Sequence, residues 1–263
     1  MKTSWQNKTA LITGASSGIG AAVTRRLAGQ GLRVVLAARR LERLQSLADE
    51  IERRGGQAAV LAADLSQEST RLEIFKRFSQ LYGCPDVLVN NAGFAYYGYT
   101  DRMPWSAARG MIDLNVTAAA HLACLFLPGM LARRSGHIIN VGSVNGVMPS
   151  QGTALYSASK AFLGAFTTSL HRELRGSGVQ ASVVYPGPVA TELFDNSEKI
   201  ANGLRVPAEA AAISPETVAD CVWSLLLRPR RSAYVPWYWA WTAPAEFFFG
   251  WAMDLVGPAL LKR

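Results

Sequence analysis

The fold of this chain is decided by residues 9–20, Thr9-Ala10-Leu11-Ile12-Thr13-Gly14-Ala15-Ser16-Ser17-Gly18-Ile19-Gly20. The apolar run at its start predicts a strand buried on both faces, and an amphipathic helical pattern begins at Ile19. Glycines between the two let the backbone turn tightly and approach a pyrophosphate, while the helix N-terminus supplies unpaired N–H groups and a positive dipole end. A Gly-rich turn taken alone would be ordinary, but its place after an apolar strand indicates a dinucleotide site.

Short apolar runs and longer helical patterns alternate along the rest of the chain. Strands are predicted at 9–13, 33–38, 58–63, 87–90, 137–141, 181–185 and 233–235. Helices are predicted at 19–30, 41–54, 67–82, 111–134, 157–176 and 215–227. This alternation predicts an α/β fold, a single Rossmann-type doubly wound parallel sheet of about seven strands with helices on both faces. Residues 192–213 are Ala-rich and predict a loose flap over the substrate.

The composition narrows the class of protein. With 263 residues, 49% of them hydrophobic and 17% charged, the chain suits one large α/β domain and argues against disorder. The net charge is +8, but the positive residues are scattered without interleaved aromatics, so we expect no nucleic-acid partner. Three widely spaced cysteines and an N-terminus without an apolar signal core predict a cytoplasmic protein. The three scattered histidines suggest no metal site.

Residues after the next strands predict the choice of cofactor. The second strand ends at Ala37-Ala38-Arg39-Arg40, where an NAD site would need a carboxylate; a guanidinium suits a 2′-phosphate, so NADP(H) is favoured. The alternative is that Arg39 and Arg40 merely begin a solvated helix, and Arg40 is the more typical of the two for that role, which leaves the phosphate contact to Arg39. Asp64, followed by Leu65, either accepts a hydrogen bond from adenine or caps the next helix. Asn90-Asn91-Ala92-Gly93 ends the fourth strand at the edge where ligands bind in open α/β sheets.

A second group of residues carries the chemistry. Tyr156 and Lys160 are four residues apart and share a helix face. A phenol with its ordinary pKa is a poor acid or base at neutral pH, so we expect the positive charge of Lys160 to lower the pKa of Tyr156. The hydroxyl of Ser143, after the fifth strand, can hold a substrate oxygen as charge develops on it. Asn115, inside an apolar helix, either holds a water that links Lys160 to solvent or is a satisfied core amide.

Together these motifs resemble the classical short-chain dehydrogenase/reductase family over residues 7–190 and, more loosely, to about residue 235. The resemblance implies a tyrosine acid/base, a lysine that binds ribose and lowers the tyrosine pKa, a serine that orients substrate and an asparagine that completes a proton relay. It also implies that Val189 and Thr191 hold the nicotinamide carboxamide. The implied catalytic residues are Asn115, Ser143, Tyr156 and Lys160. The implied cofactor-binding residues are Gly14, Ser16, Ser17, Gly18, Ile19, Gly20, Arg39, Asp64, Leu65, Asn91, Ala92, Gly93, Tyr156, Lys160, Pro186, Gly187, Val189 and Thr191.

The expected function is NADP(H)-dependent interconversion of a lipophilic ketone or aldehyde and its alcohol. The alternative is a non-catalytic NADP(H)-binding sensor or interaction module of the same fold. Aromatic residues at 94, 96, 97 and 99 and apolar residues at 144, 147 and 148 would wall the substrate site, while Arg102 and Lys199 could bind an anion. The resemblance also implies a homodimer or homotetramer paired through the helices that begin near Met111 and Tyr156.

The C-terminal segment is atypical for that family. We divide the chain into a catalytic domain, residues 1–235, and an aromatic extension, residues 236–263, with four of the seven tryptophans. Residues 244–261 predict a helix with a wide apolar surface and a narrow polar stripe. Three interpretations remain: a tail that covers the cleft or forms an oligomer interface, an interfacial helix on a membrane surface, and, least favoured, a membrane span. Arg228, Arg230, Arg231, Lys262 and Arg263 flank the tail and favour the second.

Overall fold

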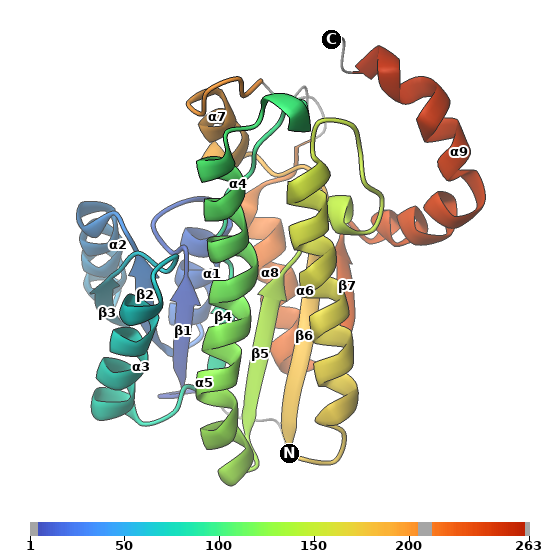
Figure 1. The fold of residues 1–263 in the computed structure, drawn as a ribbon. Helices are drawn as coiled ribbons and strands as arrows, with labels where there is room; N and C mark the ends of the chain where they lie inside the picture. The colour runs from blue at the N-terminus through green and yellow to red at the C-terminus, as the bar shows by residue number, and fades with distance from the viewer. Residues whose placement is uncertain (1–4, 205–211, 261–263) are drawn as a thin grey trace.

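A computed structural model describes residues 5–204 and 212–260 of the chain. Its core is a parallel sheet of seven strands in the order β3-β2-β1-β4-β5-β6-β7 (Figure 1). The strands are β1 (Thr9–Thr13), β2 (Arg33–Ala38), β3 (Gln57–Ala62), β4 (Val87–Asn90), β5 (Gly136–Val141), β6 (Val179–Pro186) and β7 (Ser232–Val235). The predicted doubly wound fold is confirmed, and the predicted strand bounds agree within two residues.

Helices cover both faces of the sheet (Figure 1). One layer contains α1 (Gly18–Ala28), α2 (Leu41–Arg53) and α8 (Pro215–Leu227), and the other contains α3 (Glu68–Tyr82), α5 (Ala118–Ala132) and α6 (Ala154–Glu173). Alternate residues of β1 serve the two layers: Ile12 packs in the first core cluster and Leu11 in the second, both fully buried. This two-sided burial explains why the strands are continuous apolar runs.

The predicted helix at 111–134 differs from the structure. It begins earlier, with α4 (Trp105–Met111), and continues through a π-helical turn, η2 (Ile112–Thr117), into α5. The turn carries Asn115, whose side chain bonds to the backbone of Phe94 outside the helix. A π turn inserts one extra residue, and such turns are frequent at functional sites.

The flap is also more ordered than predicted. Its first part forms a short helix, α7 (Glu192–Glu198), capped by the Thr191 hydroxyl, and Ser197 is fully buried. The first residues of the predicted flap are therefore helical, and Ser197 Oγ accepts a hydrogen bond from the Tyr97 N–H at 2.8 Å. Residues 205–211 of the predicted flap lie outside the described part of the chain.

Beyond β7 the chain forms a short 3₁₀ helix, η5 (Trp237–Trp241), and then α9 (Thr242–Leu260), which stands away from the body in Figure 1. The aromatic side chains of this tail are largely exposed: Trp237, Trp241, Phe247, Phe248, Phe249 and Trp251. Arg228, Arg230 and Arg231 precede β7, so the whole strand separates them from the tail. They therefore do not flank its aromatic surface as the sequence had suggested, and Lys262 and Arg263 lie outside the described residues.

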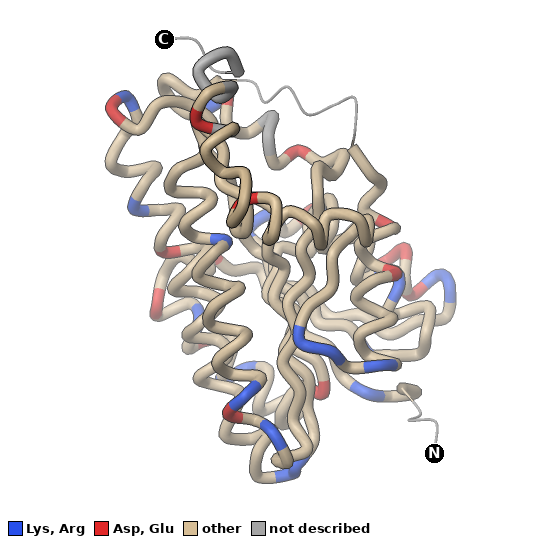
Figure 2. Tube along the Cα trace, turned by 90° about the vertical axis from the view of Figure 1, so that its right-hand side faces the viewer, with Lys and Arg blue, Asp and Glu red and all other residues tan. Residues whose placement is uncertain are grey.

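The tail carries little charge. Between Trp237 and Leu260 the sequence has no Lys or Arg and two acids, Glu246 and Asp254, and the tube of α9 in Figure 2 is almost wholly uncharged. Within the described residues, one helical stretch is long and apolar enough to cross a membrane, and it is Trp105–Ala132 rather than α9. That stretch supplies buried residues such as Leu122 and Phe126 to the core, as a core helix of a globular domain does.

Candidate active site

The main cavity opens at the carboxyl edge of the sheet and has a volume of about 780 Å³. Ligands bind at this edge in open α/β sheets, where the strand order reverses between β1 and β4. Segments that follow all seven strands contribute to its wall, represented in strand order by Gly14, Arg39, Asp64, Asn91, Ser143, Gly187 and Trp239. The topology therefore gathers residues that are far apart in sequence.

The loop after β1 forms a cradle that only glycine permits. Gly14 and Gly18 have φ of +65° and +52°, in the left-handed region. A Cβ on Gly14 would lie 2.8 Å from the Cα of Ala92, and a Cβ on Gly20 would overlap the carbonyl oxygen of Gly14. Gly14 and Gly18 leave the cradle open at the N-terminus of α1, and Gly20 allows the helix to pack closely on the loop.

Thr13 and Asn91 tie this loop to the segment after β4. The Thr13 hydroxyl donates to the Val89 carbonyl at 3.1 Å and accepts from the N–H groups of Asn91 and Ala92 at 2.9 and 3.0 Å. The Asn91 side chain donates back to the carbonyl of Thr13 at 3.0 Å. Thr13 is 2% exposed, so these bonds lie in the protein interior.

Arg40 has a larger role than the sequence suggested. It precedes α2 and is partly exposed, but its guanidinium also donates to the Ser16 hydroxyl at 3.1 Å and to the Ser17 hydroxyl at 2.6 Å. A third contact is an ion pair with Glu192 at 2.7 Å. Arg39 lines the same cavity and makes no hydrogen bond or ion pair with other described residues. Both arginines thus lie where a phosphate beside the loop would meet them.

Asp64 lies at the cavity, where the first of its two predicted roles would place it. It lines the cavity, as an adenine contact would, and its Oδ1 accepts from the N–H and hydroxyl of Ser66 at 3.0 and 2.8 Å. These two bonds form an Asx turn ahead of α3. The N-cap of α3 is Gln67 and receives no side-chain cap bond, so Asp64 does not cap the helix. Leu65 lines the cavity beside it.

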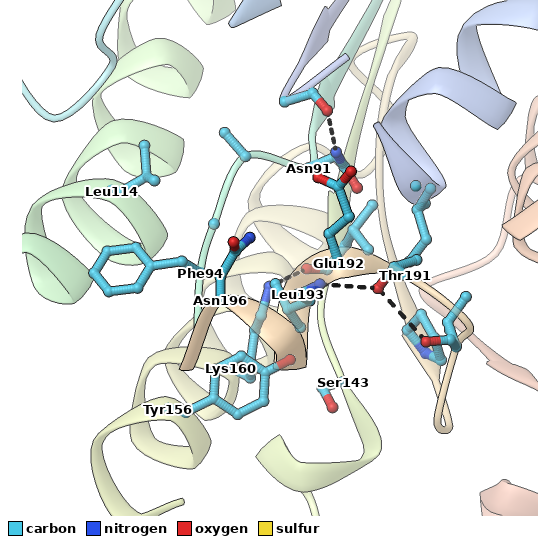
Figure 3. A pocket seen from close by; sticks show the side chains of 18 of the residues that line it. Asn91, Phe94, Leu114, Ser143, Tyr156, Lys160, Thr191, Glu192, Leu193 and Asn196 are labelled. Atoms are coloured by element: carbon cyan, nitrogen blue, oxygen red, sulfur yellow. Dashed lines mark hydrogen bonds between the residues drawn. The ribbon is translucent and has the colours of Figure 1, made fainter. Parts of the chain in front are cut away.

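The second group of predicted residues meets on the other side of the cavity. Tyr156 comes from α6, and its hydroxyl is directed toward Ser143, in the loop after β5 (Figure 3). The Lys160 ammonium donates to the Val141 carbonyl at 2.8 Å and lies 5.8 Å from the centre of the Tyr156 ring. All three side chains are buried yet line the cavity, which is how a reactive group is shielded from bulk water.

The electrostatics of this group bear on one expectation. Burial raises the pKa of Tyr156 to about 12, although the hydrogen bond with Ser143 acts in the opposite direction. Burial also lowers the pKa of Lys160 to about 8. Burial thus opposes the predicted lowering of the tyrosine pKa by Lys160, whose ammonium is directed at the Val141 carbonyl.

Asn115 lies behind the cavity wall and is 1% exposed. Its oxygen accepts from the N–H of Phe94 at 3.0 Å, and its amide donates to the Phe94 carbonyl at 2.9 Å and to the Ser159 hydroxyl at 3.0 Å. Both the oxygen and the amide nitrogen of the side chain are therefore bonded within the protein interior. A Cβ on Gly93 would lie 2.8 Å from its oxygen, so the amide also requires glycine there.

The segment after β6 closes the far side. Pro186, Gly187, Val189 and Thr191 all line the cavity, and Thr191 caps α7 while its methyl group lies against Gly18. A Cβ on Gly187 would overlap the indole of Trp239, which reaches the cavity from η5. The aromatic tail therefore supplies one wall of the site.

Most predicted residues line this cavity; Gly20 and Asn115 instead support it from behind. The predicted aromatic wall is realised in part: Phe94 and Tyr97 line the cavity, whereas Tyr96 is fully buried and donates to the carbonyl of Asn202. Val144, Met148 and Lys199 also line it. Sequence reasoning missed Leu114, Glu192, Leu193, Asn196, Ile200 and Trp239, which no motif marks.

Comparisons with known proteins agree with this geometry. The family model described as short chain dehydrogenase matches residues 8–201. An uncharacterized oxidoreductase of Myxococcus xanthus is 42% identical over 186 residues, which are 71% of this chain and 74% of that protein.

Two solved structures extend the likeness over most of the chain. A metagenomic short-chain oxidoreductase in complex with NADP has 36% identity and a TM-score of 0.72, covering 86% of this chain and 92% of its own. A short-chain dehydrogenase from Sphingobium yanoikuyae in complex with NADPH has 31% identity and a TM-score of 0.81, covering 94% of each chain.

Proposed function

The chain belongs to the short-chain dehydrogenase family and is an oxidoreductase of that family, and from this premise we propose that it uses NADP(H) to interconvert a lipophilic ketone or aldehyde and its alcohol. The observation that carries the proposal is that Tyr156, Ser143 and Lys160 share one cavity with a glycine cradle and two arginines. The NADP and NADPH bound by the two solved relatives support the choice of cofactor.

The residues present fit that cofactor. A Cβ on Gly14 would fill the cradle in front of α1, and the absence of an acid at the end of β2 leaves Arg39 and Arg40 to neutralise a 2′-phosphate. Asp64 and Leu65 would border the adenine, and Val189 and Thr191 the nicotinamide. When bound, the nicotinamide supplies or accepts the hydride.

The protein's own contribution is to hold the substrate oxygen and to move one proton. With its pKa raised to about 12, the Tyr156 hydroxyl keeps its proton at neutral pH, so the proton that ketone reduction needs is present beside the substrate oxygen. The raised pKa also makes the phenol a weaker acid, so its transfer depends on charge stabilisation by neighbouring groups. Ser143 provides a second hydroxyl at the same place and can stabilise charge that develops on that oxygen. Lys160 supplies a positive charge at the site. Asn115 holds the segment after β4, which borders the cavity, through its bonds to Phe94.

The substrate class follows from the cavity walls. Apolar side chains surround the space beside Tyr156: Phe94, Leu114, Val144, Met148, Leu193, Ile200 and Trp239. Such walls favour a lipophilic carbonyl compound, because a small charged substrate would lose its hydration there. Polar side chains also line the cavity, among them Lys199 and Asn196, which are 2.9 Å apart, and Asn145, Ser150, Gln151 and Thr153, and they would tolerate a polar group on the substrate.

The direct test is Tyr156→Phe, with Tyr97→Phe as the matched control, since Tyr97 lines the same cavity. We expect Tyr156→Phe to lose at least 100-fold in turnover of a lipophilic ketone with NADPH while binding NADPH normally. Tyr97→Phe should retain most of its activity. Comparable turnover by the Tyr156 variant and the wild type would refute the assignment of the proton donor.

We also propose that the protein is a cytoplasmic homodimer or homotetramer and that residues 1–235 form the catalytic domain with residues 236–263 as an extension. The exposed aromatic surface of η5 and α9 supports association through the tail, with a second copy or with a lipid surface. Light scattering of the intact chain and of a chain ending at Pro236 tests association with a second copy. Sedimentation of the same two chains with anionic liposomes tests association with a lipid surface. Equal behaviour of the two chains in both experiments would remove the tail from either role.

A further inference from the structure

One ion-pair cluster crosses the mouth of the cavity. Glu192 accepts from Arg40 at 2.7 Å through Oε2 and from Arg43 at 2.6 Å through Oε1. The two arginines stand at the start of α2, on the side of the cavity built by β2. Glu192 is the first residue of α7, on the side built by β6. The cluster thus joins two segments about 150 residues apart in sequence.

All three nitrogens of the Arg40 guanidinium donate hydrogen bonds in this arrangement, through four of its five N–H groups. Its Nε and Nη2 donate to Ser16, Nη2 also donates to Ser17, and Nη1 donates to Glu192. A carboxylate and a phosphate make the same kind of charge-assisted hydrogen bonds with a guanidinium. Glu192 therefore binds one of the two arginines, Arg39 and Arg40, that would neutralise a 2′-phosphate on the adenine side of the site.

The other end of the cluster leads to the substrate. Leu193 and Asn196, on the first turns of α7, line the cavity, as does Ile200 just beyond this helix. Figure 3 shows Glu192, Leu193 and Asn196 projecting from this segment around the site. Glu192 thus lies on the same short helix as two side chains that wall the substrate space.

We propose that Glu192 is a cofactor-specificity residue: its carboxylate is an internal competitor for the 2′-phosphate at Arg40, and exchange of the two anions couples the choice of cofactor to the position of α7. The proposal rests on the NADP(H) use proposed above. A cofactor without the 2′-phosphate leaves the Arg40–Glu192 pair in place. A cofactor with it takes Arg40, and Arg43 retains the displaced carboxylate, so that α7 shifts without detaching.

The charge state of Glu192 supports a competition that persists over the whole physiological range. Its hydrogen bonds with Arg40 and Arg43 lower the pKa of the carboxyl to about 2, so it stays ionised. The side chains of the cluster are 41–50% exposed, so solvent and salt weaken the pairs. The competition is therefore modest and reversible, as an exchange with a ligand requires.

The test measures binding of NADPH and NADH by calorimetry to the wild type, Glu192→Gln and the control Glu198→Gln, which changes an exposed acid at the other end of α7. Removing the competing charge should lower the Kd of NADPH roughly three- to tenfold and change the Kd of NADH less than twofold, since exposed ion pairs of this kind are weak. Glu198→Gln should change neither. Equal tightening of both cofactors, no change, or weaker NADPH binding would overturn the proposal.

Two further measurements separate competition from a structural effect. In an Arg40→Gln background, Glu192→Gln should no longer affect NADPH affinity, because the shared cation is gone. Hydrogen exchange of the α7 amides should rise when NADPH binds to the wild type but not when NADH binds. An unchanged effect in the Arg40→Gln background, or identical exchange with the two cofactors, refutes the exchange of anions. A wild type that binds neither cofactor would refute the proposed function itself, which is a distinct result.

Discussion

Replacing Thr13 by Val should destabilise the protein far more than the same replacement elsewhere in the core. Val has nearly the same shape as Thr but lacks the hydroxyl. At Thr13 that hydroxyl serves three backbone groups, the carbonyl of Val89 and the N–H groups of Asn91 and Ala92. The Thr13 side chain is 2% exposed, so water does not readily reach these three backbone groups to replace the lost hydroxyl.

The magnitude follows from the groups left without a partner. A buried donor or acceptor that loses its hydrogen bond costs about 1–3 kcal/mol, and partial relaxation of the loop lowers the sum for three such groups to about 3 kcal/mol. For a chain of this size, about 3 kcal/mol lowers the melting temperature by roughly 6–10 °C. Because the same bonds hold the Asn91–Gly93 segment against the glycine cradle, cofactor affinity should fall as well.

The matched control is Thr24→Val. Thr24 is fully buried in α1, and its hydroxyl makes one bond, to the carbonyl of Gly20 at 2.8 Å. That carbonyl already belongs to the hydrogen-bond ladder of the helix, so its loss should cost less than about 1 kcal/mol. Urea unfolding of both variants gives the comparison. Equal destabilisation by the two substitutions would show that the Thr13 bonds do not hold the site together.

Two pH effects follow from buried bases. Burial lowers the pKa of His137 from 6.5 to about 3, so the unfolded chain binds this proton first as the pH falls, and the free energy of unfolding should fall by roughly 2 kcal/mol between pH 6 and 4. Urea unfolding of His137→Gln should show that this loss is removed. An identical acid sensitivity of the variant and the wild type would contradict the prediction. Burial lowers the pKa of Lys160 from 10.5 to about 8, so the folded protein loses this proton first and its stability should rise by roughly 2 kcal/mol between pH 8 and 10. The difference in free energy of unfolding between the wild type and Lys160→Met should therefore rise over this pH range. Parallel stability curves for the two proteins would exclude the effect.

Much of the fold was predictable because its signals are local. The runs at Thr9–Thr13 and Arg33–Ala38 are apolar throughout, since both faces of a parallel strand are covered, and the structure has these strands with the predicted bounds. The helix from Ser214-Pro215 is likewise placed by its cap and first-turn proline. The π turn at Ile112–Thr117 has no local mark in the sequence, and the side-chain bonds that its Asn115 makes are with a loop about twenty residues away.

Some residues of the site also carry a local signal in the sequence, and others do not. The glycines at 14 and 18 could be predicted because a positive φ leaves a mark on the sequence. Nothing local marks Trp239 as a wall of the cavity, since its contact with Gly187 exists only after β7 has paired beside β6. Arg40 was misjudged for a related reason: an arginine at a helix start is usually solvated, and only the tertiary structure brings Ser16, Ser17 and Glu192 within its reach.

The pKa values of the central pair also decide which way a proton moves in the proposed reaction. The sequence suggested that Lys160 keeps Tyr156 partly ionised, but burial moves the tyrosine pKa up to about 12 and the lysine pKa down to about 8. A phenolate formed when Tyr156 gives its proton to the substrate would therefore be the stronger base of the two, and the Lys160 ammonium the stronger acid. Replacement of the proton from the lysine side is then downhill, and no ionised tyrosine is needed beforehand. Ketone reduction should accordingly decline as the pH rises through about 8, where Lys160 loses its proton, and steady-state rates from pH 6 to 10 would show it. A rate that keeps rising through pH 8 would mean that ionised Tyr156, and not the lysine, limits the reaction.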